Sequence, residues 1–112
     1  MSEVDKLRRA FSTLTSLKQN VLEEGHHLHE RYVTEYHRVV DGLEKQGMDL
    51  TEFKIPQSEL KPILASYNGL SGESTYSDDN YVQKTFFLMK LDALLGYFSL
   101  TIDDKKPHIG FK

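Results

Sequence analysis

Apolar residues recur at heptad spacing along the N-terminal part of this chain. The steps between them are three, four or a multiple of seven residues, and no proline interrupts the series. A repeat of 3.5 residues keeps one apolar seam on one side of an α-helix and favours packing against a partner helix. The seam consists of Val4, Leu7, Phe11, Leu14, Val21, Leu28, Tyr32 and Val39. We therefore predict one long helix over residues 1–47, ended by Gly47.

The heptad repeat is imperfect, because Lys18, Gly25 and Glu35 fall on seam positions. A glycine inside a helix costs about 1 kcal/mol relative to alanine. Gly25 therefore marks a kink or a point where another backbone comes close. Two helices that meet at Gly25 are the alternative, although no turn-forming cluster surrounds it.

Residues 48–78 form a connector in this interpretation. Pro56 and Pro62 prevent a long helix there and bias the residues before them to extended conformations. The stretch YNGLSGESTYSD that follows is rich in Ser and Gly, and its Asn68-Gly69 pair is a turn signal. We predict a mobile surface loop for this stretch.

Residues 79–100 form the second helix in this prediction, and its surface is apolar almost all round. Such a helix is buried on most sides. Asp92 lies between Leu91 and Ala93 within it. A buried carboxylate needs a partner or takes up a proton, so we predict a buried ion pair with an arginine or histidine of the long helix. The tail, residues 101–112, is predicted to be extended, with Ile109 and Phe111 free to dock on the core.

These elements predict a single all-α domain of the helical-bundle type, with the long helix antiparallel to the buried helix. Two helices cannot cover all the apolar surface of residues 82–98, so we expect a homodimer or a larger protein partner. The coiled-coil seam supplies the predicted partner contacts, which are Leu7, Phe11, Leu14, Val21, Leu28 and Tyr32.

The composition narrows the classes of partner and chemistry. The formal net charge is -3, which gives no reason to expect nucleic acid or an anionic membrane. Cysteine is absent, so disulfides, thiolate metal sites and cysteine nucleophiles are excluded. The sequence shows no signal peptide and no apolar run of membrane-spanning length. We expect a cytoplasmic protein without a cofactor.

A histidine cluster around residues 26–37 is the most conspicuous chemical feature. Histidine or glutamate side chains three or four positions apart on a helix can share a metal ion, as His26 could with His29 or Glu30. A third ligand would have to come from elsewhere, for example from His108. A solvated helix face is the preferred interpretation, and a pH response at an interface is a further alternative.

Arg31 and His37 have the R-x5-H spacing that lies within the loose pattern of HEPN-type ribonucleases. In that class an arginine and a histidine act on the scissile phosphate and the attacking 2′-hydroxyl. Tyr32 stands where that class usually has a polar residue. On a straight helix, a step of six positions also rotates the side-chain direction by about 240° around the axis, so the two side chains point to different sides.

Three segments carry a resemblance to a known family. The stretches IPQSELKP, TYSDDNYV and FFLMKLDALLGYF resemble a small family of uncharacterised prokaryotic helical proteins, across residues 28–102. Some of its members lie beside antiviral-defence genes. The resemblance implies an accessory or effector-associated module and carries no catalytic or binding residue to this chain.

The sequence therefore favours a non-catalytic helical interaction or assembly module, an accessory of a prokaryotic defence system. The alternative is a small HEPN-like ribonuclease or nucleotide-responsive protein that uses Arg31 and His37.

Overall fold

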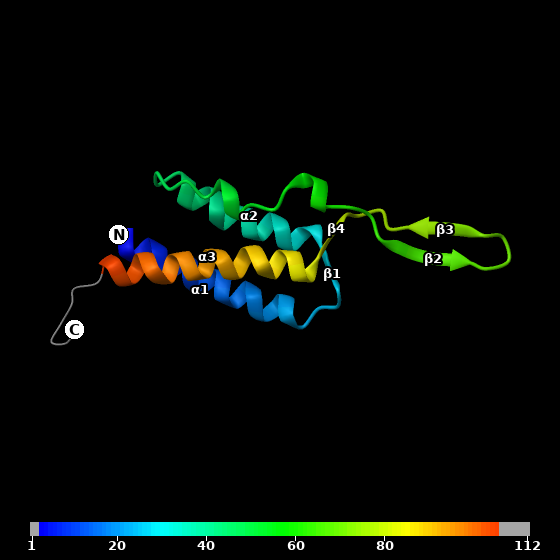
Figure 1. The fold of residues 1–112 in the computed structure, drawn as a ribbon, viewed down its shortest axis with the longest axis horizontal. Coiled ribbons are helices and arrows are strands. Elements are labelled where there is room, and N and C mark those ends of the chain that lie inside the picture. The colour runs from blue at the N-terminus through cyan, green and yellow to red at the C-terminus, as the bar shows by residue number, and fades with distance from the viewer. Residues whose placement is uncertain (1–2, 106–112) are drawn as a thin grey trace.

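The chain folds into a body of three helices with an arm that projects from one end (Figure 1). A computed structural model describes the backbone of residues 3–105 and the side chains of residues 5–100. The elements in chain order are α1 (Glu3–Leu22), β1 (His27–His29), α2 (Glu30–Glu44), the 3-10 helices η1 (Thr51–Phe53) and η2 (Gln57–Glu59), β2 (Leu64–Asn68), β3 (Glu73–Tyr76), β4 (Tyr81–Gln83) and α3 (Lys84–Lys105).

The three helices lie side by side around one core, with α1 antiparallel to α2 and α3 (Figure 1). The core side chains are apolar, and every helix contributes fully buried ones. Examples are Leu14 of α1, Val40 of α2 and Leu91 of α3, each 0% exposed. Burial of this kind is the main stabilising term of a small domain.

The prediction of one long helix over residues 1–47 is wrong. α1 ends at Leu22, a turn follows, and β1 pairs antiparallel with β4 before α2 begins. Strand pairing between residues far apart in sequence overrides the local helical pattern here. The structure thus matches the alternative of two helices that meet near Gly25. The second of them, α2, ends before Gly47, whose φ of 98° suits only glycine.

The all-α fold class is also wrong, as are the helical-bundle and coiled-coil interpretations. The described residues contain two antiparallel sheets of two strands each, β1 with β4 and β2 with β3. The protein is therefore a mixed α/β fold. The sequence pattern missed these strands because each is at most five residues long.

The connector predicted over residues 48–78 contains two 3-10 helices and the β2–β3 hairpin in place of a featureless loop. Tyr36 holds the first part of it, because its buried hydroxyl donates to the Phe53 carbonyl at 2.7 Å. Helix α3 begins at Lys84, since β4 occupies the first turn predicted for it. The tail predicted to be extended is helical to Lys105, and Ile109 and Phe111 lie outside the described residues.

The seam residues predicted to contact a partner face the interior of the same chain. Phe11 is half-buried, and the others are at most 9% exposed: Leu7, Leu14, Val21, Leu28 and Tyr32. α3 supplies their cover through Phe87, Leu91, Leu94 and Phe98. These side chains therefore pack mainly against the core of their own chain, and the predicted seam is not an open partner surface in this fold.

Candidate functional site

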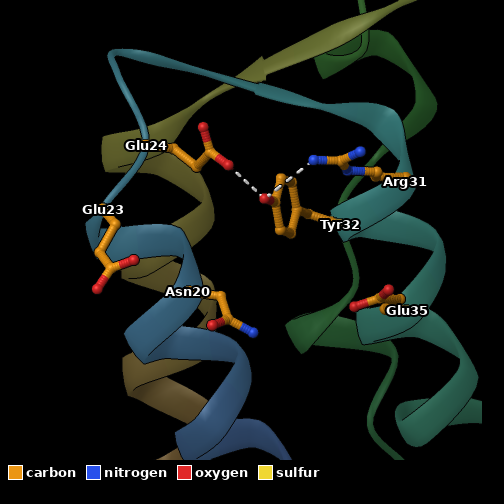
Figure 2. A pocket seen from close by; sticks show the side chains of 6 residues that line it. All are labelled: Asn20, Glu23, Glu24, Arg31, Tyr32 and Glu35. Atoms are coloured by element: carbon orange, nitrogen blue, oxygen red, sulfur yellow. Dashed lines mark hydrogen bonds between the residues drawn. The ribbon is translucent and has the colours of Figure 1, made fainter.

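An open notch of about 500 Å³ lies between the end of α1 and the start of α2 (Figure 2). Arg31 and Glu24 both point to the hydroxyl of Tyr32, which donates to the Glu24 carboxylate and accepts from the Arg31 guanidinium at 3.3 Å. The hydrogen bond to Tyr32 raises the pKa of Arg31 above its ordinary value. The remaining wall is polar, formed by Asn20, Glu23 and Glu35. The Tyr32 hydroxyl is thus held between a carboxylate and a guanidinium in a notch whose lining includes three glutamates.

The structure does not bring Arg31 and His37 to one site. Arg31 lies in the notch and stacks its guanidinium on the Tyr32 ring, 5.0 Å from the centroid. His37 lies on another side of α2, where its Nε2 accepts the backbone N–H of Ile55 at 2.9 Å. His37 thus holds the connector on α2, and this arrangement gives no support to a ribonuclease pair.

The contact between His37 and Ile55 predicts a pH dependence of stability. Burial lowers the pKa of His37, partly opposed by the nearby Asp41 carboxylate. Because the neutral ring accepts from Ile55, its contribution is fully present above the ordinary histidine pKa of about 6.5. The contribution is lost as the pH falls through the lowered folded-state pKa. We expect wild type to lose more unfolding free energy than His37→Gln between about pH 7.5 and 5.5, measured by urea denaturation.

His26→Gln is the matched control for this titration, because it replaces an exposed histidine by the same side chain. We expect it to keep the wild-type pH profile. Identical profiles for wild type and His37→Gln would contradict the assigned role of His37.

The residues considered as a metal site have structural partners instead. His29 caps α2: its Nδ1 accepts the Arg31 N–H, and its Nε2 lies 2.9 Å from an Asp79 carboxylate oxygen. Glu30 accepts the backbone N–H of Asn80 at 3.3 Å, and His26 is exposed. Among the described residues no group of three or more His, Cys, Asp or Glu side chains could hold a metal ion. His108 lies outside those residues.

Asp92 is paired, but it is not buried. Its carboxylate lies 2.8 Å from the Lys18 ammonium, and the Asp92 side chain is more than half exposed. Asp92 lies on the outer side of α3, next to the exposed Ala93, whereas Leu91 fills the core. The predicted buried ion pair is therefore a surface ion pair between α1 and α3, which contributes little to stability.

The arm of Figure 1 is the β2–β3 hairpin, and its base is held firmly to the body. Lys61 and Tyr81 exchange two backbone hydrogen bonds of 2.9 and 2.8 Å, and Ser77 donates its N–H to the Ile63 carbonyl. Tyr81 belongs to β4, which pairs with β1 in the body. The hairpin thus continues a ladder that begins next to the helices, and its position is fixed at the base.

A β-bulge at Ala65 determines which side chains of the hairpin share a face. Opposite residues of an antiparallel pair share a face, and the register pairs Leu64 with Tyr76 and Tyr67 with Ser74. Without the extra residue, Leu64 would lie on the other face, because side chains alternate along a strand. The bulge therefore gathers Leu64, Tyr67 and Tyr76 on one face, which we call the aromatic face.

The aromatic face is uncovered by the described part of the chain. Leu64, Tyr67 and Tyr76 are 55%, 63% and 60% exposed. The opposite face carries only polar side chains, Ser66, Asn68, Glu73 and Thr75. Sequence reasoning recognised the Asn68-Gly69 turn but not the strands beside it or the face they form.

A second uncovered apolar surface lies on α3. Met89, Ala93, Gly96 and Leu100 follow one another at steps of four, three and four, so they share one side of the helix. All four are exposed, and Met89 and Leu100 reach 57% and 68%. We call this surface the outer stripe. None of the helices in the described part of the chain is long and apolar enough to cross a membrane.

Comparison with protein families, with curated proteins and with solved structures finds no match to this chain. The geometry of the chain itself therefore carries the functional argument.

Proposed function

We propose that this protein is a non-catalytic interaction and assembly module that binds a protein partner through the aromatic face of the β2–β3 hairpin. The observation that carries the proposal is the one-sided exposure of Leu64, Tyr67 and Tyr76 on an arm that projects from the body. Contiguous exposed apolar side chains beside polar ones are typical of protein-binding surfaces. Tyrosine is also enriched at the energetic centres of such interfaces.

The charge of the arm favours protein over nucleic acid as the partner. Glu73 is the one charged residue of β2 and β3, and the whole chain has a net charge of -3. Nucleic-acid binding relies on lysine and arginine contacts to phosphates, which the two strands lack. The accessory role in antiviral defence stays part of the proposal, and its support is the resemblance of residues 28–102.

The test is a comparison of two double variants in affinity purification from the native host. Tyr67→Ser with Tyr76→Ser removes both rings of the aromatic face, and Ser66→Asn with Thr75→Ser changes the polar face of the same strands. Mass spectrometry identifies the recovered proteins, and light scattering follows self-association. We expect the first variant to lose its partner, whether self or another protein, and the second to keep it.

All four positions are exposed, so both variants should unfold like wild type in urea, within about 0.5 kcal/mol. If wild type binds neither itself nor another protein, or if both variants retain all binding, the proposed function is refuted.

A further inference from the structure

We propose that the occupant of the aromatic face is a second copy of this chain, docked through its outer stripe, so that two chains exchange arms reciprocally. This inference rests on the proposed function and names the partner of the same face. The hairpin of each chain then lies along α3 of the other, and one two-fold axis relates both contacts.

The hairpin itself requires a covering layer. A lone two-stranded hairpin is marginal in water, and it becomes stable when its apolar face packs against a helix or a further strand. The base of β2 and β3 is held by Ile63 and Ser77, but no described side chain covers the rings of Tyr67 and Tyr76. A helix of another chain would supply this layer.

The length and the surface shape of the outer stripe fit the hairpin. From Met89 to Leu100 it extends about 16 Å at the helical rise of 1.5 Å per residue. From Leu64 to Asn68, β2 extends about 14 Å at roughly 3.4 Å per residue, so the strand fits within this length. Ala93 and Gly96 form a shallow centre between Met89 and Leu100, and a Cβ added to Gly96 would meet no atom within 4 Å. Bulky rings on the hairpin can therefore approach the α3 backbone there.

Charge also fits a contact between these two surfaces. Glu73 lies on the polar face of the hairpin, away from the aromatic face. Asp92, beside the outer stripe, is neutralised by Lys18 at 2.8 Å. Among the described side chains, neither surface therefore brings an unpaired charge into the contact, and burial of an unpaired charge would oppose association.

The exposed area explains why both surfaces must act together. A tyrosine buries 150–250 Å² when fully covered, so Tyr67 and Tyr76 each offer roughly 100 Å². The aromatic face alone is then well below the roughly 800 Å² per partner of a standard interface. Reciprocal docking adds the outer stripe to the buried area of each chain and approaches the size of a reversible dimer. Edge-to-edge pairing of two hairpins would leave both apolar surfaces in water.

The direction of the arm permits this exchange. The hairpin continues along the long axis of the molecule, beyond the end of the body where α3 begins (Figure 1). A second chain turned by 180° and set beyond that end would receive this arm along its α3. Its own arm would then return along the first α3.

Because the natural chain has no cysteine, introduced cysteines report this contact cleanly. Ser74→Cys lies on the aromatic face and keeps both tyrosines, whereas Ala93→Cys lies in the outer stripe. The two variants, differing in mass by a tag, are mixed at about 100 µM in mild oxidant, a concentration suited to a micromolar dimer. We expect a disulfide between the two variants. The control is Thr75→Cys mixed with Ala93→Cys, which places the thiol on the polar face one residue away.

Reciprocal docking predicts at least tenfold more mixed dimer from Ser74→Cys than from Thr75→Cys. It also predicts that this mixed dimer is lost when Tyr67→Ser and Tyr76→Ser are added. Dimers formed mainly by Ser74→Cys alone, or mainly by Ala93→Cys alone, overturn it in favour of hairpin–hairpin or α3–α3 contact. A monomer without disulfides also overturns it. If the monomer still binds a different protein, and Tyr67→Ser with Tyr76→Ser abolishes that binding, the proposed function is supported although reciprocal docking is refuted. If the chain binds no protein at all, both proposals are refuted.

Discussion

Replacement of Leu14 by alanine lowers the free energy of unfolding by about 2–5 kcal/mol, the range for removal of a buried leucine side chain. Leu14 is 0% exposed in the middle of α1, where it belongs to the core shared by α1, α2 and α3. The lost methyl groups leave a cavity that the closely packed neighbours fill only in part. Urea denaturation followed by circular dichroism measures the effect as a lower midpoint at an unchanged slope.

Ser16→Ala is the control for this prediction, because Ser16 is exposed on the same helix. We expect it to change the unfolding free energy by at most about 0.5 kcal/mol. The loss in Leu14→Ala should not depend on protein concentration, since the cover of Leu14 comes from its own chain. A variant that stays as stable as wild type but no longer self-associates would instead place the heptad seam at a subunit interface.

The heptad pattern predicted which residues are buried better than it predicted the elements that bury them. Leu28 shows why, because it is fully buried as the middle residue of β1 although its spacing to Tyr32 is helical. An apolar side chain at this position can fill the core whether its backbone is a helix or a strand. The choice between helix and strand at residues 27–29 depends on pairing with β4, more than fifty residues away, and local periodicity contains no information on that pairing.

The hairpin was missed for a related reason. Asn68-Gly69 is a recognised turn signal, and Tyr67, Thr75 and Tyr76 beside it are residue types favoured in strands. Ser and Gly dominate the composition and favour a loop interpretation. The bulge at Ala65 also breaks the alternation that would have marked an amphipathic strand. Hence the aromatic face can be recognised only once the register is known.

The residues that the sequence offered as candidate metal ligands or catalytic groups have separate structural roles in the fold. His29, His37 and Glu30 each accept a backbone N–H, at the start of α2, at the connector and beside β4. Spacing along a helix could not predict these roles, because every donor except Arg31 comes from a different segment. The surplus of apolar surface on the second helix, by contrast, was predicted from the sequence, and the outer stripe is where the structure locates it.

The outer stripe gives the second large expected effect. Met89→Lys should raise the dissociation constant of the dimer at least about tenfold, equivalent to 1.4 kcal/mol, because docking of the hairpin would bury an unpaired ammonium. Lysine is a good helix former and Met89 is 57% exposed, so the monomer should unfold within about 0.5 kcal/mol of wild type. Sedimentation equilibrium measures the association, and urea denaturation measures the stability.

Ser16→Lys adds the same charge to an exposed position of α1 and should leave the dissociation constant unchanged. This control separates a local effect at the stripe from the change in net charge, which is equal in both variants. If Met89→Lys associates like wild type while Tyr67→Ser with Tyr76→Ser does not, the hairpin docks on a surface other than α3. Leu14 and Met89 are thus opposite cases. In the proposed dimer, buried Leu14 stabilises the fold of its own chain, whereas exposed Met89 contributes to the binding of the second chain.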